Sequence, residues 1–578
     1  MRAGLLALAL LAPALCAAQS AAQRLDSLAA EAQERGLDLF PHGEVYSRGA
    51  GPRQDRLEFT FTAEHRERQR ELQRWILKGL DGIPTAELGP SEKLTHELLA
   101  WRARESLQWL SYPFHQHSLF TQFGVVYGLV RLVGQQPFRH EDDYRAWFRR
   151  LSRYPALMDA LAQVLREGRD AGITTPRVLV ERTLGQLDAL ESQMSLWQPV
   201  RNFPEGMDAA ARARIEAEYR KLLAEEIFPA VRKLAAFVRS DYLPHARTTD
   251  GFGALPGGAD MYRWAVRSET TTDMTPHEIH RLGLKEVKRV QASFLAASAR
   301  AGFTGTMKEF GAWLQSKPEN YPFTSPQEVI EHLNRLHARI VPQMPKLFAR
   351  LPKAGFAIRL TDPAIAGSTP AQYHWPTDDG RPGIFTMPVV NPRMTSTFGL
   401  AALLAHEGMP GHHLDAGFKL ENRMPEFRRR LSIVAFGEGW ALYAESLGHE
   451  LGLYDEPIEL MGRYSFELFR ACRLVVDTGL HRRGWSRQRA IRWMTDECGR
   501  GNATNEVLRY MVWPGQALGY KIGELTILDL RAKAEKRLGT RFDIRAFHDA
   551  VLGEGHMPLS MLRQRVEAWI EAQNAKGQ

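Results

Sequence analysis

The stretch His406-Glu407-Gly408-Met409-Pro410-Gly411-His412-His413 decides how this chain is interpreted. In the metal-binding pattern H-E-x-x-H, two histidines one helical turn apart bind zinc, and the glutamate beside the first one acts as a general base. Here the next histidine follows His406 after six residues, at His412, or after seven, at His413. The sequence therefore predicts a zinc site whose local backbone departs from the usual helix.

A regular α-helix would bring neither later histidine to the metal held by His406. Each residue turns the helix by about 100°, so His412 would lie about 240° away from His406 and face another side. His413 would return to the same face, but about 10 Å farther along the axis. Two imidazoles on one zinc, each about 2.0–2.1 Å from the ion, could hardly span that separation.

The residues between the histidines favour a local distortion. Pro410 has no backbone N–H to donate, and Gly408 and Gly411 permit unusual backbone angles. We therefore expect a bulge of about two residues that returns one histidine to the metal. His412 is the preferred ligand and His413 the second choice. The alternative is a helix C-terminus that merely contains histidines.

A catalytic zinc requires a third protein ligand and an open position. The segment Gly437-Glu438-Gly439-Trp440-Ala441-Leu442-Tyr443-Ala444-Glu445 offers two glutamates within a predicted helix. They are seven residues apart and therefore near one face. Glu438 is predicted as the ligand, whereas Glu445 is either the alternative ligand or a residue that orients a ligand histidine.

Two later segments offer groups that could assist catalysis. Asp477 and His481 are four residues apart, so on a helix the aspartate could orient the histidine for a transition-state role. A purely structural hydrogen bond is the alternative. Tyr520, favoured over Tyr510, could donate to the oxyanion formed during attack on an amide, although simple aromatic packing would also explain a tyrosine there.

The first 18 residues predict a signal peptide. Arg2 supplies the positive charge, Leu5 to Leu15 form a short apolar run, and Cys16-Ala17-Ala18 offers a small-residue cleavage site. The run is shorter than the roughly 18–20 residues that a membrane span requires. A lipid anchor at Cys16 is the less favoured alternative, because Leu15 is large for the position before the cysteine.

Composition indicates an ordinary globular protein and excludes some partners. The chain has 578 residues, of which 44% are hydrophobic and 25% charged, with a net charge of +8. The charges are scattered and no nucleic-acid-binding module is evident, so a nucleic-acid partner is not expected. After signal cleavage only Cys472 and Cys498 remain, and they could form one disulfide or stay as two buried thiols.

Helix-period patterning dominates the chain and predicts a mainly α fold. Two apolar stretches, Phe356–Leu360 and Gly383–Met387, are typical of strands, and the residues between them are rich in proline and glycine. We expect them to form a small antiparallel sheet just before the metal helix. The fold class is therefore α, or α+β with this small sheet.

Four motifs together carry a resemblance to a known family: HEGMPGHH, GEGWALYAE, DTGLHRRGWS and YMVWPGQALGYKIG. From about residue 25 to its C-terminus, the chain resembles the bacterial family called domain of unknown function 885. That family is similar to the gluzincin metallopeptidases, which include thimet oligopeptidase, angiotensin-converting enzyme and the Taq carboxypeptidases. Those enzymes have mostly helical, cleft-shaped folds.

The resemblance implies ligand roles for His406, His412 and Glu438 and a base role for Glu407. It also supports a tyrosine at the oxyanion. Two departures affect these expectations. The two-residue insertion leaves the choice between His412 and His413 open, and Asp415 stands where glutamine is expected in this family.

The sequence thus predicts an exported zinc metallopeptidase that cleaves short peptides in a deep cleft. Residues 19–578 would form one catalytic unit, with a helical lobe to about 270 and a metal-site lobe from about 271. Glu407 would be the base, and Tyr520 with His481 would stabilise the oxyanion. Hydrolysis of a non-peptide amide or cell-wall fragment, or a non-catalytic periplasmic binding role, are the alternatives.

The partners predicted from the sequence are short peptides, without nucleic acid and without a transmembrane anchor after signal cleavage. Arg509 and Arg531 are candidates for binding a terminal carboxylate. Neither the end at which a peptide would be cut nor the oligomeric state follows from the sequence.

Overall fold

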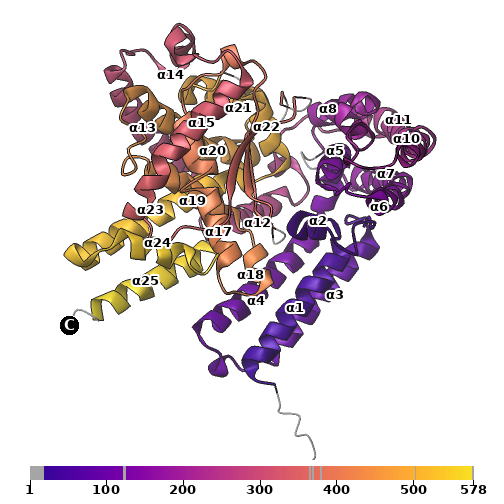
Figure 1. Cartoon of the computed structure of the whole chain (residues 1–578), viewed down its shortest axis with the longest axis horizontal. Coiled ribbons are helices and arrows are strands. Elements are labelled where there is room, and N and C mark those ends of the chain that lie inside the picture. The colour runs from indigo at the N-terminus through magenta and orange to yellow at the C-terminus, as the bar shows by residue number, and fades with distance from the viewer. Residues whose placement is uncertain are drawn as a thin grey trace, which may run out of the picture.

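The computed structural model describes residues 19–120, 125–363, 366–367, 370–377, 380–501 and 503–575. The predicted signal segment, residues 1–18, lies outside this range. Helices make up most of the described chain and a small three-stranded sheet completes it, which confirms the mainly α prediction (Figure 1). Of the helices in this range, none is both long and apolar enough to cross a membrane.

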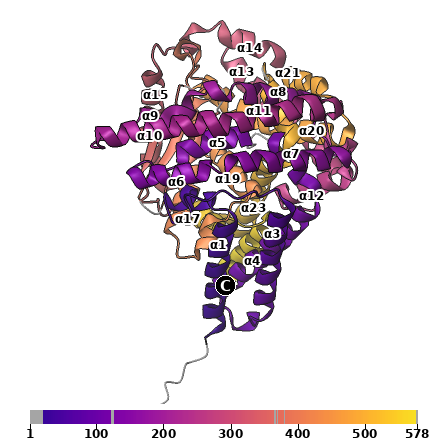
Figure 2. The same cartoon turned by 90° about the vertical axis from the view of Figure 1, so that its right-hand side faces the viewer.

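The N-terminal part of the chain forms a helical arm and a helical lobe. The arm has its own apolar core, which includes Leu25, Leu72 and Leu99, and it projects below the rest of the molecule (Figure 2). The lobe has a second core around Trp147, Leu161 and other buried side chains. The arm helices are α1 (Ala21–Leu39), α2 (His42–Arg48), α3 (Ala63–Asp81) and α4 (Pro90–Ser111). The lobe helices are α5 (Val125–Gln135), α6 (Glu141–Leu151), α7 (Tyr154–Asp170), α8 (Arg177–Asp188), α9 (Gln198–Arg201), α10 (Ala209–Leu222) and α11 (Phe228–Phe237).

The remaining chain forms the body of the molecule. Its first helices are α12 (Gly258–Thr270), α13 (Pro276–Arg300), α14 (Met307–Gln315) and α15 (Pro326–Ile340). After the sheet come α16 (Leu400–Glu407), α17 (His412–Glu421), α18 (Glu426–Arg430), α19 (Val434–Ser446), α20 (Pro457–Arg483), α21 (Arg487–Cys498) and α22 (Thr504–Val512). The last helices are α23 (Gly519–Leu538), α24 (Ile544–Leu552) and α25 (Leu559–Ala575).

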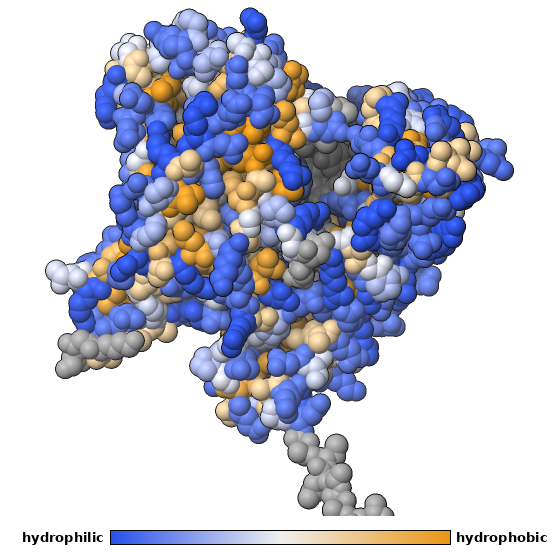
Figure 3. Space-filling model, in the orientation of Figure 1, coloured by the Kyte–Doolittle hydropathy of each residue, from blue (hydrophilic) through white to orange (hydrophobic). Residues whose placement is uncertain are grey.

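The surface is hollowed between the body and the lobe (Figure 3). The core of the lobe extends to Ala246, and Phe252 already belongs to the core of the body. The predicted division of the chain near residue 270 stays a prediction.

The sheet is mixed, so the prediction of a purely antiparallel sheet was wrong. Strand β3 (Gly383–Met387) lies in the centre, with β1 (Phe356–Leu360) parallel to it and β2 (Gln372–His374) antiparallel. Both predicted strands exist at the predicted bounds. The connection between them is long enough to cross over, and its short strand β2 occupies the antiparallel position.

Close packing of α19 against α23 brings later parts of the sequence to the motif helix. Gly439 on α19 faces Gly523 on α23, and a Cβ atom at Gly439 would lie only 2.5 Å from the Cα of Gly523. Glycine at this crossing therefore allows the two backbones to approach closely. The neighbouring side chains of Glu438 on α19 and Tyr520 on α23 reach the same region as a result.

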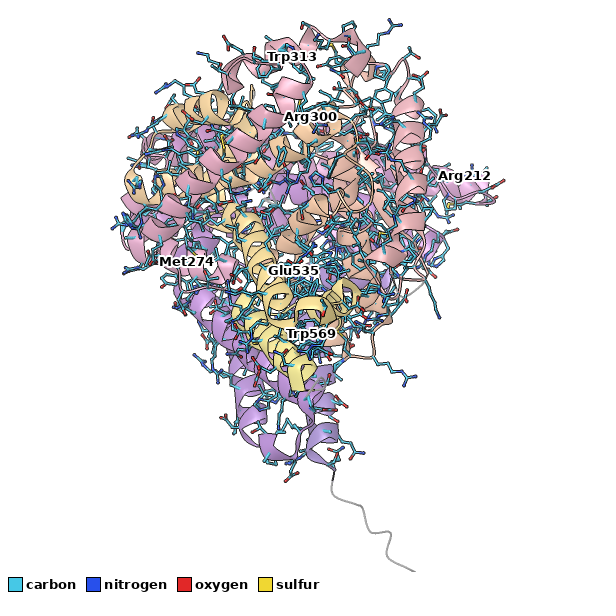
Figure 4. The ribbon with its side chains drawn as sticks, turned by 90° about the vertical axis from the view of Figure 1, so that its left-hand side faces the viewer. Arg212, Met274, Arg300, Trp313, Glu535 and Trp569 are labelled. Carbon is cyan, nitrogen blue, oxygen red and sulfur yellow. A yellow bond between two sulfur atoms is a disulfide. The ribbon has the colours of Figure 1, made fainter. Side chains whose placement is uncertain are left out.

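Two further connections organise the C-terminal part of the body. Cys472 on α20 forms a disulfide with Cys498 at the end of α21, which selects the paired alternative for these cysteines. Figure 4 shows α23 and α25, which carry the labelled Glu535 and Trp569, on one side of the body. An ion pair of 2.6 Å between Arg537 Nη2 and Glu571 Oε1 joins these two helices.

Candidate metal centre

The histidine motif interrupts the helix completely. Helix α16 ends at Glu407 and α17 begins at His412, so four residues leave the helical path. The distortion is therefore larger than the expected bulge of about two residues. A Cβ atom at Gly411 would lie 2.0 Å from the carbonyl oxygen of His406, so only glycine fits this return of the chain. The indole N–H of Trp440 donates to the carbonyl oxygen of Pro410 at 2.9 Å and fixes the connection.

This break brings His406, His412 and Glu438 together. One nitrogen or oxygen atom from each side chain lies within 4.8 Å of the others. Nε2 of His406 is 3.4 Å and Nε2 of His412 is 3.3 Å from Oε2 of Glu438. The side chains of His412 and Glu438 are 17% and 24% exposed, so the cluster opens to solvent on one side.

His413 points elsewhere although it follows His412 directly. Its side chain is fully buried, and its Nδ1 is 2.8 Å from the hydroxyl oxygen of Tyr373 on β2. Its ring packs against Phe356 of β1, with 4.8 Å between the ring centres. Burial lowers the pKa of His413 to about 4, so the ring is neutral. The geometry therefore favours His412 as the histidine that joins His406.

The three donors fit a zinc ion chemically. Two imidazole nitrogens and one carboxylate oxygen form a ligand set found in catalytic zinc sites. Oε2 of Glu438 is buried and makes no hydrogen bond to any described residue, as expected for an atom that receives a cation. Burial opposes the charged form of Glu438, but the rings of His412 and His406 outweigh it and hold its pKa well below the usual range.

Glu445 orients His406 from behind. Its Oε1 lies 2.9 Å from Nδ1 of His406, in a buried position, which leaves Nε2 directed at the cluster. Burial tends to lower the pKa of His406, but the contacts with Glu438 and Glu445 outweigh it and raise this pKa to about 9. Of the two roles considered for Glu445, the orienting role fits the geometry.

We expect Glu445→Gln to weaken zinc binding by roughly 10- to 100-fold, as loss of a partner that orients a ligand histidine usually does. The neutral amide keeps the shape but removes the charge that supports the imidazole. Competition with a chelating dye measures the affinity, and Glu450→Gln, at an exposed glutamate nearby, is the control. Equal affinity of wild type and Glu445→Gln would contradict the orienting role.

Glu407 lies beside the cluster at the end of α16. Its side chain is largely buried, and this burial raises its pKa above the usual value of a glutamate. A carboxylate with a raised pKa is a more effective proton acceptor near neutral pH. Its position and environment therefore suit the base role predicted from the motif.

The structure also separates the two candidate tyrosines. The ring of Tyr520 lies parallel to that of His406, with 6.5 Å between the ring centres, so Tyr520 borders the cluster. Tyr510 is buried, and its hydroxyl donates to Glu506 at 2.8 Å. The structure thus brings Tyr520, and not Tyr510, to the side of the metal centre.

His481 does not join the site, contrary to the expected catalytic role. Its Nδ1 accepts from the backbone N–H of Phe252 at 3.0 Å, and its Nε2 lies 3.0 Å from the carbonyl oxygen of Tyr510. Burial lowers the pKa of His481 to about 3 and keeps it neutral. Asp477 contacts the hydroxyl of Tyr262 at 2.6 Å. Asp477 and His481 thus bond to other groups and not to each other. Both residues hold the surrounding segments in place.

Three other expectations concern residues near the motif or the substrate. Asp415, the departure from the family pattern, is buried and lies 2.7 Å from Nε2 of His556. Arg531 pairs with Glu450 at 3.1 Å. Arg509 lies close to the candidate site, since its Nη1 donates to Gln516 at 2.9 Å, four residues before Tyr520.

Sequence reasoning missed Tyr373, Arg470 and Arg473. The ring of Tyr373 stacks near that of His412, at 6.3 Å, and its hydroxyl contacts His413. The guanidinium group of Arg473 lies 4.5 Å from the ring centre of Tyr520. The two arginines flank Cys472, but this signal becomes useful only once the disulfide of Cys472 is known.

Comparison with known proteins agrees with this architecture. The model of the family described as "Bacterial protein of unknown function (DUF885)" matches residues 45–566. The chain belongs to this family. No curated protein matches it.

Two solved structures share this fold. One is the crystal structure of a candidate lipoprotein from Colwellia psychrerythraea, with 26% identity and a TM-score of 0.89, over 96% of this chain and 100% of that one. A candidate lipoprotein of unknown function from Shewanella oneidensis has 18% identity and a TM-score of 0.71, over 95% of this chain and 99% of that one. An M32 carboxypeptidase from Deinococcus radiodurans R1 has 13% identity and a TM-score of 0.43, over 96% and 98%, which is too distant to support an argument.

Proposed function

We propose that this member of the DUF885 family is an exported, gluzincin-like zinc metallopeptidase that hydrolyses short peptides. The observation that carries the proposal is the cluster of His406, His412 and Glu438, whose donor atoms lie within 4.8 Å of one another. Glu407 lies directly beside it. A general base next to such a cluster argues for hydrolysis rather than simple metal binding.

In this proposal each residue of the site has a separate task. His406, His412 and Glu438 would hold a zinc ion, whose Lewis acidity would polarise a carbonyl group and lower the pKa of a nearby water. Glu407 accepts a proton from the attacking water and passes it to the leaving amine as the C–N bond breaks. Tyr520 donates a hydrogen bond from its phenolic hydroxyl to the oxyanion that forms on the attacked carbonyl. His481 has no part in the reaction.

Three observations support export. Residues 1–18 have the pattern of a signal peptide. The disulfide between Cys472 and Cys498 is typical of an oxidising compartment such as the periplasm. The two similar structures from Colwellia and Shewanella carry the description of candidate lipoproteins. Release by signal cleavage remains the preferred form of export, with a lipid anchor at Cys16 as the alternative.

The test is hydrolysis of a mixed library of short peptides by zinc-loaded protein, followed by mass spectrometry. We expect one zinc per chain, defined cleavage products, loss of cleavage after chelation and recovery when zinc is returned. The new termini also show at which end the peptides are cut. If zinc binds one-to-one and no peptide is cut, the peptidase proposal fails, and a non-peptide amide substrate or a binding role takes its place.

A further inference from the structure

Four arginines gather around Tyr520 and the neighbouring ring of Phe469, and we call them the arginine cluster. Arg470 and Arg473 lie on α20, Arg500 follows α21, and Arg509 lies on α22. The guanidinium carbons of Arg473 and Arg470 are 4.5 and 5.9 Å from the ring centre of Tyr520. The arginine cluster therefore borders the same tyrosine that lies beside the metal centre.

The disulfide explains why Arg500 belongs to this group. Cys472 lies between Arg470 and Arg473 in the sequence, and it is bonded to Cys498, two residues before Arg500. The covalent link thus holds the turn after α21 against the middle of α20. The guanidinium of Arg500 and that of Arg473 lie 4.1 and 4.2 Å from the ring centre of Phe469.

The positive charge of the arginine cluster is only partly balanced. Oε2 of Glu506 receives hydrogen bonds from Arg473 at 3.2 Å and Arg509 at 3.1 Å. Arg470 lies 3.7 Å from Glu445, but that carboxylate also holds His406. Four guanidinium groups thus share two carboxylates in the described part of the chain. Grouped like charges in a partly buried site favour the binding of an anion.

Arg500 is the member that forms no ion pair with a described carboxylate. Its guanidinium makes no hydrogen bond or ion pair with any described residue, and it is held by the rings of Phe469 and Phe466. Burial and the charge of Arg470 lower the pKa of Arg500 to about 10, so it still carries its charge at neutral pH. Arg500 and Arg509 are half-buried, whereas Arg470 and Arg473 are buried. Of these two accessible members, Arg509 is paired with Glu506 and Arg500 is not paired with any described carboxylate, so Arg500 is the better candidate to bind an anion.

We propose that the arginine cluster binds a carboxylate group of the substrate, with Arg500 as its main contact. The planar guanidinium group matches the two oxygens of a carboxylate, and stacking on aromatic rings leaves its N–H edges free. The inference rests on the proposed peptidase function and names its substrate class: short peptides that present a carboxylate on the Tyr520 side of the cleavage site. This carboxylate is either the C-terminus or an Asp or Glu side chain.

The test compares three peptides that share one cleavable bond. The first ends in a free carboxylate, the second in an amide, and the third in an amide next to a glutamate side chain. We expect wild type to cleave at least one carboxylate-bearing peptide with a kcat/KM roughly 10- to 100-fold above that of the plain amide. Arg500→Gln should lose this preference, so that its kcat/KM values for the carboxylate-bearing peptides and the plain amide become similar.

A matched control is Arg492→Gln, since Arg492 is exposed on α21, only eight residues before Arg500. It should keep the full preference. Arg500 makes no hydrogen bond that its replacement could break among the described residues, so Arg500→Gln should fold normally, which its thermal unfolding checks. A preference for the free acid identifies the C-terminus as the ligand, and a preference for the glutamate peptide identifies a side chain.

Either of two results would overturn the inference: wild type cleaves all three peptides equally, or the preference survives in Arg500→Gln. If no peptide is cleaved at all, the proposed function is contradicted, but the inference is not. In that case calorimetric binding of the acid and amide peptides to zinc-loaded wild type and Arg500→Gln decides the inference. Tighter binding of the acid that Arg500→Gln loses supports it, and equal binding contradicts it.

Discussion

His412→Ala is expected to lose zinc, whereas His413→Ala, one residue later, is expected to keep it. Nε2 of His412 lies 3.3 Å from Oε2 of Glu438, but the ring of His413 is buried against Phe356 and contacts Tyr373. Loss of a residue that only orients a ligand costs roughly 10- to 100-fold in metal affinity, so loss of a ligand should cost more. Zinc content after dialysis, measured by mass spectrometry, reports the difference directly.

The His413→Ala variant should instead lose stability. Its hydrogen bond with Tyr373 is partly buried, and removing one partner of such a pair costs about 1–3 kcal/mol of unfolding free energy. That is a fraction of the roughly 5–15 kcal/mol of a typical domain, so the variant should still fold. Chemical denaturation of both variants separates stability from metal binding. If His413→Ala loses zinc while His412→Ala retains it, the assignment of the ligand is wrong.

The residue types of the motif were enough to predict that the helix could not be regular. Spacing alone excluded a straight helix, and the glycines and Pro410 marked where it would fail. The choice between His412 and His413 stayed open because the backbone path of residues 408–411 decides which of the two rings faces His406. That path is set by contacts from distant segments, such as the indole of Trp440 and the close approach of Gly411 to His406.

Longer-range relations were predicted less well. The two main strands were placed at their observed bounds, but their parallel pairing depends on how the connection between them crosses, which residue patterns do not encode. The spacing of Asp477 and His481 suggested a catalytic pair. Backbone groups of Phe252 and Tyr510 engage the histidine instead, and neither segment is near it in sequence. Local spacing predicts which face a residue occupies, not what packs against that face.

The arginine cluster is the clearest part of the site that sequence could not predict. Its members come from three separate segments that the disulfide and the rings of Phe469 and Phe466 bring together. In the sequence they are four of many arginines on amphipathic helices, where a solvated face is the ordinary interpretation. Only the disulfide between Cys472 and Cys498 indicates that Arg500 lies near the arginines of α20.

The second large effect is expected for Glu407→Gln, which should bind zinc as wild type does and lose most of its peptide hydrolysis. A general base contributes roughly 10²–10⁴-fold to a rate, so kcat should fall by about that factor while KM changes little. Glutamine keeps the size of the side chain but cannot accept the proton from the attacking water. Glu407 is not among the three residues whose donor atoms converge, so its replacement leaves the ligand set intact.

Three measurements together make this result specific. Zinc content shows that the metal centre persists, thermal unfolding shows that the protein is folded, and initial rates on one cleaved peptide give kcat and KM. Glu456→Gln, at an exposed glutamate at the start of α20, serves as the matched control and should retain full activity. A Glu407→Gln variant that holds zinc and still cuts at the wild-type rate would remove the base role. A variant that loses both zinc and activity would place Glu407 in the structure of the metal centre rather than in proton transfer. Burial raises the pKa of Glu407 and makes its charged form costly. A role in proton transfer explains why a carboxylate occupies this buried position beside the metal centre.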